Sequence, residues 1–223
     1  MLKHLFLILF FFATFFVVAQ KLPKGFSYVK DIAPTIQKEL RYCSHNNFLG
    51  VPVDGYEEPV LITSTKTARA LKKVQDQLLK RGFSLKVFDA YRPQTAVNHF
   101  VRWARIPNDT LTKKDYYPAL NKRNLFKLGY IATRSGHSRG SSVDLTIVNL
   151  KTGRELDMGS PYDFFGKISH ALYPNLTKLQ KRNRMLLRKT MLANGFRPYK
   201  NEWWHFTLNN EPFPKTYFDF PIK

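Results

Sequence analysis

Two short segments of the sequence each place a potential metal ligand on a strand that also has an apolar face. The first, SGHSRGSSVD over residues 135–144, contains His137 and Asp144 and leads into the apolar run LTIV. The second, EWWHFTL over residues 202–208, contains His205. Because side chains alternate between the two faces of a strand, each polar residue should point away from its apolar neighbours. We therefore predict two strands that each pack one face against a hydrophobic core and carry a potential metal ligand on the other face.

A three-ligand metal site follows if these two strands are neighbours. Asp144 and His205 would then meet on the same face, and His137 could reach them through a turn at Gly140. Two histidines and one carboxylate, with the fourth position left to water, make the arrangement that catalytic zinc uses. The predicted cofactor is one Zn²⁺ per chain.

A carboxylate and a guanidinium beside this cluster suggest catalysis. Glu202 lies three residues before His205, so it should precede the strand, on a loop from which its carboxylate reaches the metal. There it can take a proton from zinc-bound water and pass it to a leaving amine. Arg92 follows the apolar segment LKVFDA and could stabilise negative charge on a carbonyl oxygen. Alone, Arg92 could equally be a surface arginine paired with Asp89.

The hydrophobic pattern predicts a mixture of helices and strands. Helices are expected over 63–81, from 93 as the first residue to 104, and from a cap at 177 to 194. Strands are expected over 85–90, 145–150 and 204–208, with an irregular segment over 107–130. The predicted fold class is α+β: a small antiparallel sheet has helices packed on one face and the zinc site on the other.

The first 19 residues differ from the rest. A positively charged start precedes an apolar run from Leu5 to Val18, and small residues follow as far as Ala19. The run is short for a membrane span and suits a secretory signal. We predict a signal peptide over residues 1–19, cleaved near Ala19, and a single catalytic domain over residues 20–223. The protein is then periplasmic or secreted, although a retained membrane anchor or a buried helix stays possible.

The charge balance is strongly basic. The sequence contains 36 Lys and Arg against 16 Asp and Glu, a net charge of +20. This favours polyanionic partners such as a membrane surface or a wall polymer, although a solvated basic surface is the simpler explanation. No nucleic-acid motif accompanies the charge, so no nucleic-acid partner is expected. The single cysteine, Cys43, excludes an internal disulfide and zinc sites built from two or more cysteines.

The motifs resemble those of a known family. SGHSRGSSVD resembles the pattern S-x-H-x-x-G-x-A-x-D of the zinc D,D-peptidases, and EWWH matches their E-x-W-H. Further similarity to the dipeptidase branch covers RYCSHNNFLGVPVDGYE, FDAYRPQTAV, LTKKDYYP, MGSPYDFF and EPFPKTYFDFPIK. It extends from Asp31 to Lys223. The resemblance implies the same three zinc ligands, the same base and the same arginine as the reading above.

The resemblance also implies residues that bind the substrate. Asp163 matches the acid that meets the free ammonium of a dipeptide, and Tyr42 and Ser135 match positions that line the pocket. One departure is Ser142, where the family pattern has alanine. Because serine is only one hydroxyl larger, we expect the zinc ligands to keep their places.

The implied activity is zinc-dependent hydrolysis of D-Ala-D-Ala to two D-Ala. A signal peptide would place it outside the cytoplasm, in turnover of wall-derived dipeptide or its scavenging. The expected partner is the small dipeptide, with no membrane span after signal cleavage. Two alternatives stay open: a D-alanyl-D-alanine carboxypeptidase acting on longer muropeptides, and a non-catalytic wall-binding module. A closed pocket around Asp163 would admit dipeptides only, whereas a carboxypeptidase needs an open groove there.

Overall fold

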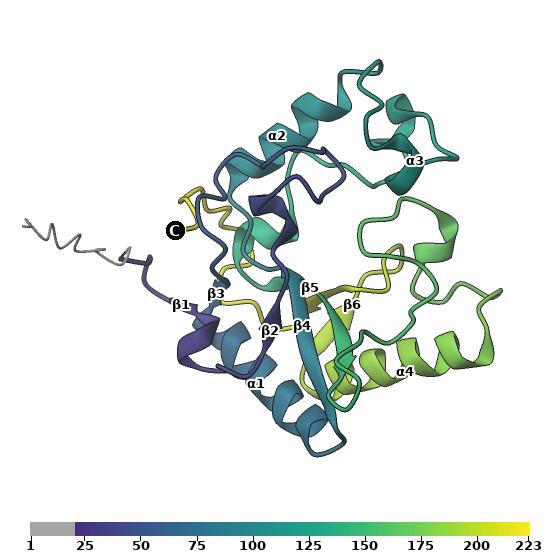
Figure 1. The fold of residues 1–223 in the computed structure, drawn as a ribbon. Coiled ribbons are helices and arrows are strands. Elements are labelled where there is room, and N and C mark those ends of the chain that lie inside the picture. Colours follow the sequence, from purple (N-terminus) through teal and green to yellow (C-terminus); the bar gives the residue numbers. More distant parts are fainter. Residues whose placement is uncertain (1–20) are drawn as a thin grey trace, which may run out of the picture.

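A five-stranded sheet forms the centre of the structure (Figure 1). The computed structural model describes residues 21–223, so the predicted signal peptide lies outside the described residues. The strand order is β2-β4-β5-β7-β6. The strands are β2 (Gln37–Lys38), β4 (Phe83–Asp89), β5 (Ser142–Asn149), β7 (His205–Leu208) and β6 (Phe196–Pro198). All neighbours pair antiparallel except β2, which runs parallel to β4. The α+β prediction is confirmed, with one short parallel edge strand added.

The other elements surround this sheet. A second, two-stranded sheet pairs β1 (Phe26–Tyr28) with β3 (Ile62–Ser64). The α-helices are α1 (Thr65–Leu79), α2 (Gln94–Ala104), α3 (Lys113–Tyr116) and α4 (Lys178–Ala193). Short 3-10 turns lie at η1 (Val29–Asp31), η2 (Arg41–Cys43), η3 (Lys122–Asn124), η4 (Gly136–Arg139) and η5 (Lys167–Ser169). In Figure 1, α1 and α4 lie below the sheet, whereas α2 and α3 lie above it.

The two long helices begin at capping residues. The Ser64 hydroxyl accepts a hydrogen bond from the Thr67 N–H at the start of α1. The Thr177 hydroxyl and the Gln180 side chain form a reciprocal capping box at the start of α4. Such caps satisfy backbone N–H groups that have no partner within the helix. The helix after β4 begins at Gln94, so the proline before it is the capping residue rather than the first helical residue, as its extended ψ of 148° requires.

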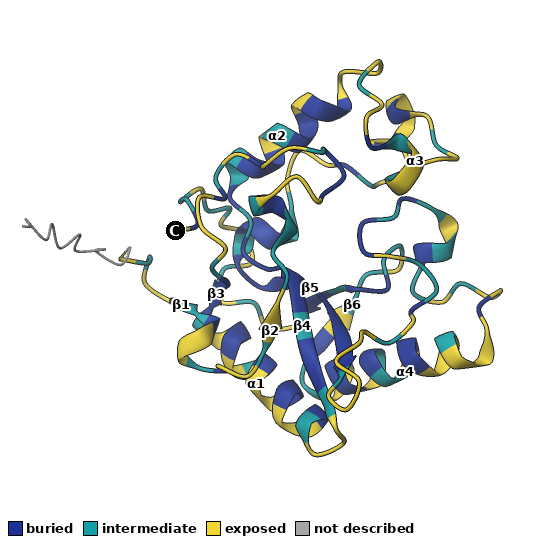
Figure 2. Cartoon of the chain, viewed as in Figure 1, coloured by how far each residue is buried: buried dark blue, intermediate teal, exposed yellow. Residues whose placement is uncertain are grey.

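One face of the sheet packs against α1 and α4 in a hydrophobic core. The core residues of β4 and β5 are fully buried, as are those that face them from the helices (Figure 2). They are Leu85, Val87, Val143, Leu145, Ile147, Leu71, Val74, Leu78, Leu187 and Met191. A second cluster, rich in aromatic rings, lies under α2 and includes Tyr42, Phe48, Phe100, Trp103 and Phe165. No helix of the described residues is long and apolar enough to cross a membrane.

The opposite face of β5 and β7 is polar although it is almost as buried. Alternation from the core-facing residues places Ser142, Asp144 and Thr146 of β5 on this face, with His205 and Thr207 of β7. β5 begins three residues earlier than the apolar pattern predicts, because Ser142 and Asp144 pair with Thr207 and His205. The strand therefore includes the polar residues that precede the apolar run.

Candidate active site

The register of β5 and β7 brings two of the predicted metal ligands together. Asp144 and His205 are directly paired Cα partners. His137 lies on the 3-10 turn η4. Its own backbone N–H donates a hydrogen bond to the hydroxyl of Ser135, which caps the start of this turn. The chain then turns through Gly140, which has a φ of 74°, and continues into β5. This left-handed conformation suits glycine, and the turn directs His137 back over the two strands.

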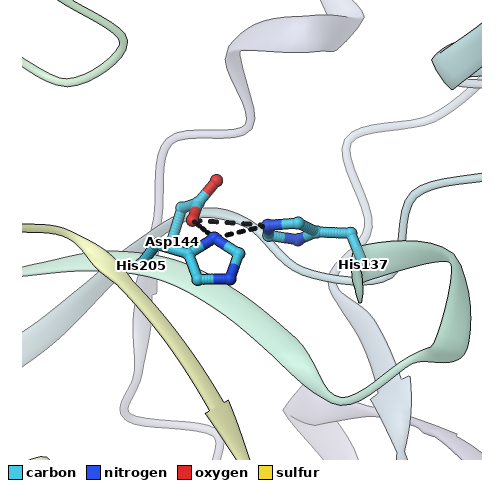
Figure 3. Close-up of side chains that lie close together, drawn as sticks. All are labelled: His137, Asp144 and His205. Atoms are coloured by element: carbon cyan, nitrogen blue, oxygen red, sulfur yellow. Dashed lines mark hydrogen bonds and ion pairs between the residues drawn. The ribbon is translucent and has the colours of Figure 1, made fainter. Parts of the chain in front are cut away.

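Three ligand atoms converge at one point (Figure 3). The His205 Nδ1 lies 3.0 Å from the Asp144 Oδ1 and 3.1 Å from the His137 Nε2. The His137 Nε2 lies 3.4 Å from the same carboxylate oxygen. Ligands held at the usual zinc distances, at the corners of a tetrahedron, would be about 3.3 Å apart. The spacing of these atoms therefore fits a single zinc ion.

The surroundings of the ligands agree with this fit. Asp144 Oδ1 is buried and accepts no hydrogen bond from any described residue. Such an oxygen is costly to bury unless a cation meets it. The Nδ1–H of His137 can donate to the Ala90 carbonyl at 2.7 Å, which leaves the Nε2 lone pair free for a metal.

The departure from the family pattern is accommodated. The Ser142 hydroxyl lies 2.7 Å from that of Thr207. The Thr207 hydroxyl in turn lies 3.3 Å from the Nε2 of His205, the ring nitrogen that points away from the cluster. Ser142 is thus hydrogen-bonded within the sheet and does not displace a ligand. This short chain of hydroxyls also helps to orient the His205 ring.

Glu202 lies on the loop that leads into β7, as predicted. Its Oε2 is 3.6 Å from the His205 Nδ1. Burial raises the pKa of Glu202 to about 7; the nearby His205 opposes this shift and Asp144 adds to it. A carboxylate with a pKa near neutrality is well suited to accept and release a proton.

Arg92 is held rigidly beside the cluster. Its Nε and one terminal nitrogen donate to Asp89 Oδ2 at 2.9 and 2.8 Å, and the guanidinium stacks over the Phe100 and Tyr42 rings. It lies 3.6 Å from Asp144 Oδ2. A cation fixed in this way is organised before substrate arrives, as electrostatic stabilisation of a transition state requires.

Asp89 was underestimated from the sequence, where it was only a possible surface partner. It is buried, and it also accepts a hydrogen bond from the Tyr56 hydroxyl at 2.7 Å. It lies 3.6 Å from His137 Nδ1. This carboxylate therefore fixes the arginine and lies close to a predicted metal ligand, whose Nδ1–H donates to the Ala90 carbonyl. Its place at the end of a buried strand, three residues before Arg92, was the available signal.

Asp163 occupies an unusual position. It is buried, and with a φ of 61° it is the only non-glycine residue of the described chain in the left-handed region. The Tyr42 hydroxyl donates to its Oδ2 at 2.8 Å. Burial, with the nearby Asp144 charge, raises the pKa of Asp163 well above its usual range. A strained, buried carboxylic acid of this kind is typical of a functional site.

A second tyrosine links this acid to the ligand cluster. The Tyr162 hydroxyl lies 3.2 Å from both the Tyr42 hydroxyl and Asp144 Oδ2. Tyr162 lies in the family-like segment MGSPYDFF, next to Asp163, but no role was predicted for it, because its contacts join segments distant in the chain. Because Tyr42 donates to Asp163, the single Tyr162 proton goes either to the Tyr42 oxygen or to Asp144 Oδ2, and the two hydroxyls lie in a row between the predicted substrate-binding acid and a predicted zinc ligand.

All eight predicted site residues line one cavity of about 230 Å³. They are Tyr42, Arg92, Ser135, His137, Asp144, Asp163, Glu202 and His205. Tyr130, Tyr199 and Phe165 also line it and were not predicted: Tyr130 and Tyr199 lie in irregular segments without a motif, and Phe165 ends the family-like segment MGSPYDFF, where only Asp163 was given a role. The structure thus brings the set together, and the role of each member stays a prediction.

An α+β domain whose cavity joins a candidate His–Asp–His metal site, a buried glutamate and a fixed arginine fits the class of metallopeptidases. The family model described as D-ala-D-ala dipeptidase matches residues 23–223, and the chain belongs to this peptidase family. The family resemblance seen in the motifs is confirmed.

Curated relatives from the same family match this chain over almost their whole length. The chain is 40% identical over 199 residues to a D-alanyl-D-alanine dipeptidase of Enterococcus faecium, covering 89% of this chain and 98% of the relative. It is 42% identical over 197 residues to one of Streptomyces coelicolor, covering 88% and 98%. A solved LD-carboxypeptidase, LdcB, is a distant likeness: it has 16% identity and a TM-score of 0.43 over 86% of this chain and 72% of that chain.

Proposed function

We propose that this chain is an exported zinc dipeptidase that hydrolyses D-Ala-D-Ala to two D-Ala. The observation that carries the proposal is the single cavity in which a complete set of ligand, base, arginine and ammonium-binding residues meets. The names of the relatives, which match across nearly their full length, support the same substrate.

His137, Asp144 and His205 would hold the zinc ion, which supplies a Lewis acid and a water of lowered pKa when bound. Glu202 accepts a proton at its carboxylate and delivers it to the leaving amino group. Arg92, fixed by its carboxylate partner and two aromatic rings, stabilises the negative charge that develops on the carbonyl oxygen.

Asp163 selects for a free amino terminus. In the absence of substrate its burial and the nearby Asp144 charge raise its pKa by more than the Tyr42 hydroxyl and Arg92 lower it. An entering ammonium group adds a positive charge and favours the carboxylate form. Tyr42 donates to the same carboxylate and keeps it oriented. A peptide with more residues on this side would bring an uncharged amide against a buried acid and lack the favourable charge pair.

The proposed location rests on the first 19 residues. We expect a signal peptide cleaved near Ala19, so that the enzyme meets its dipeptide outside the cytoplasm, in wall turnover or scavenging. N-terminal sequencing of the natural protein tests this: a start near Gln20 supports export. An intact Met1 on protein in the cytoplasm contradicts it, and an intact Met1 on membrane-bound protein indicates a retained anchor.

The activity is tested with the chain from Gln20 onward, assayed on D-Ala-D-Ala, its N-acetyl derivative and a pentapeptide ending in D-Ala-D-Ala. We expect kcat/KM to be at least about a hundredfold higher for the free dipeptide, equivalent to roughly 2.7 kcal/mol. Metal analysis should find one zinc per chain, and chelation should abolish turnover. Equal rates on free and acetylated dipeptide would indicate the carboxypeptidase, and no turnover of any peptide by zinc-loaded protein would indicate a binding module.

A further inference from the structure

The outward face of α4 combines cations with exposed apolar side chains. Met185 is 41% exposed and Leu192 is 43% exposed, and the two lie seven residues apart, on the same side of the helix. A pair of cations precedes each of these two residues, at the positions three and four residues earlier, as the sequences KRNRM (181–185) and RKTML (188–192) show. The pairs are Lys181 with Arg182 and Arg188 with Lys189. Residues three and four apart are neighbours on a helix surface, so an apolar stripe runs between two rows of cations.

These cations are not paired with acidic side chains in the part of the chain that the structure describes. None of the five cations Lys178, Lys181, Arg182, Arg188 and Lys189 forms an ion pair with any described residue, and α4 contains no acidic residue. The sixth, Arg184, differs because it is buried and donates to three backbone carbonyls. The outward charges are therefore unused by the fold.

The neighbouring helix α1 shows that this arrangement is not general. It packs on the same face of the sheet and also carries several cations, but Asp76 pairs with its Lys72. None of its large apolar side chains is exposed in the described structure. The two helices have similar structural tasks, so the extra apolar exposure on α4 calls for an explanation outside the fold.

A groove of about 540 Å³ continues the surface beyond the helix. Its apolar lining includes Leu172, which is 69% exposed, with Tyr173 and Pro174. Lys167, Arg188 and Lys200 line the same groove. The combination of exposed apolar groups and unpaired cations thus extends from α4 to the adjoining loop.

We propose that the α4 surface, comprising the outward residues of α4 and this groove, docks the protein on an anionic phospholipid bilayer. Exposed apolar side chains enter the boundary between headgroups and acyl chains, while flanking lysines and arginines extend toward phosphates. A soluble polyanion would use the cations but gain nothing from the apolar stripe, which is why a lipid surface fits better than a wall polymer.

The geometry keeps the active site free in the docked state. The helix packs on the apolar face of the sheet, below it in Figure 1, whereas Asp144 and His205 of the His–Asp–His cluster lie on the opposite face, because side chains alternate along a strand. A protein bound through α4 would have the ligand cluster on the far side of the sheet from the lipid, while Lys200 of the groove is next in the chain to Tyr199, which lines the cavity.

The test measures sedimentation of the chain from Gln20 onward with vesicles of phosphatidylcholine, alone or mixed with phosphatidylglycerol, at about 0.15 M salt. This part of the chain contains both hydrophobic cores and the whole family match, and 98% of the E. faecium relative aligns with this chain. Binding should require phosphatidylglycerol. The variant K181Q/R182Q/K189Q should bind at least about tenfold more weakly, because each cation near an anionic surface contributes to attachment.

A matched control removes the same charge from α1 and its C-terminal capping residue Lys80. The variant R69Q/K73Q/K80Q replaces three exposed cations that form no ion pair with any described residue, and it should retain binding within about threefold. Glutamine keeps helix propensity close to that of lysine and arginine. Equal losses in the two variants would mean attraction by net charge alone and would overturn the proposal.

A third variant separates lipid from soluble polyanion. M185Q/L192Q keeps every charge and should weaken vesicle binding several-fold while leaving binding to inorganic polyphosphate unchanged. Normal vesicle binding by this variant, or binding of the unmodified chain to polyphosphate but not to vesicles, would refute membrane docking. Melting temperature shows whether each variant is folded. Dipeptide hydrolysis is measured separately, so failure of the catalytic proposal would leave this result interpretable.

Discussion

The two faces of the central sheet differ in what their buried residues contribute. On the face toward α1 and α4, β5 presents Val143, Leu145 and Ile147 to a continuous apolar core. On the other face the same strand presents Asp144 and Thr146, each with a buried oxygen that has no hydrogen-bond partner among the described residues. One strand therefore carries both fully buried apolar side chains of the core and buried polar atoms without a hydrogen-bond partner among the described residues.

This difference separates stability from function. Burial of apolar surface stabilises the fold, whereas unpaired polar atoms, a left-handed aspartate and carboxyls with raised pKa values cost stability. Proteins commonly accept such a cost where a ligand will satisfy the groups. Substitutions on the polar face should therefore lower activity and spare stability, and those on the apolar face should do the reverse.

The largest effect is expected for Glu202→Ala. Removing the proposed base should lower kcat by about three orders of magnitude or more, while the melting temperature and zinc content stay near those of the unmodified protein. Glu202→Asp, which keeps the carboxylate but shortens its reach, should recover only part of the rate. Steady-state kinetics with metal analysis measures both. A near-normal rate in Glu202→Ala would show that another group activates the water.

The opposite outcome is expected for Leu71→Ala on α1. Leu71 is fully buried in the core under the sheet, so its truncation should cost about 2–5 kcal/mol of unfolding free energy. The value of kcat/KM for dipeptide should change less than about twofold at temperatures where the variant is folded. Denaturant unfolding and kinetics on one preparation test this. Lys73→Ala, exposed on the same helix, is the control and should change neither quantity appreciably.

The substitution Asp163→Asn tests the effect on activity and the effect on stability at a single residue. Loss of the carboxylate should lower kcat/KM for the free dipeptide about a hundredfold and affect the acetylated dipeptide much less. Stability should stay equal or rise at neutral pH, because the raised pKa of Asp163 makes its ionised form costly in the folded state. The direction of this pH dependence follows from the difference in pKa between the folded and unfolded states. A carboxyl group whose pKa is raised in the folded state contributes stability at low pH, and this contribution is lost as the pH rises through the folded pKa. A large loss of stability at neutral pH would show a structural role instead.

The strand assignments and the ligand cluster could be predicted because their signals are local. Alternation in LTIV and HFTL separated polar from apolar faces, and the proposed pairing of Asp144 with His205 agrees with the observed register. The short parallel strand β2 has only two residues, too few for any period to show. Its existence depends on a partner far along the chain.

The supporting contacts of the site could not be predicted for a related reason. Asp89 and Tyr162 act through hydrogen bonds to side chains 33 and 120 residues away, respectively Tyr56 and Tyr42. Both residues lie in segments that resemble the family, FDAYRPQTAV and MGSPYDFF, but such a resemblance does not say which distant side chains they contact, so only the folded chain reveals their partners. Likewise, the sequence showed the charge of α4, but the exposure of Met185 required the structure.

The smallest effect is expected at an ion pair that joins the active-site turn to the edge of the sheet. Glu211 is almost fully buried and accepts hydrogen bonds from Arg139 at 2.7 and 2.9 Å and from Arg197 at 2.7 Å. Arg139 belongs to η4, two residues after His137, and Arg197 belongs to β6. Burial by itself would raise the pKa of Glu211, but these two arginines lower it below its usual value.

Glu211→Gln should therefore lower the unfolding free energy by about 1–2 kcal/mol at pH 7, with most of the effect from Arg139 because Arg197 is more exposed. A depressed carboxyl pKa contributes stability that is present above the unfolded value of 4.5 and is lost as the pH falls through the lower, folded value. The difference between the two proteins should thus be constant from pH 7 to about 5 and shrink toward zero below 4. Urea unfolding across this range measures it. A difference that persists unchanged at the lowest pH would mean that the shape of the side chain, rather than its charge, stabilises the turn that carries His137.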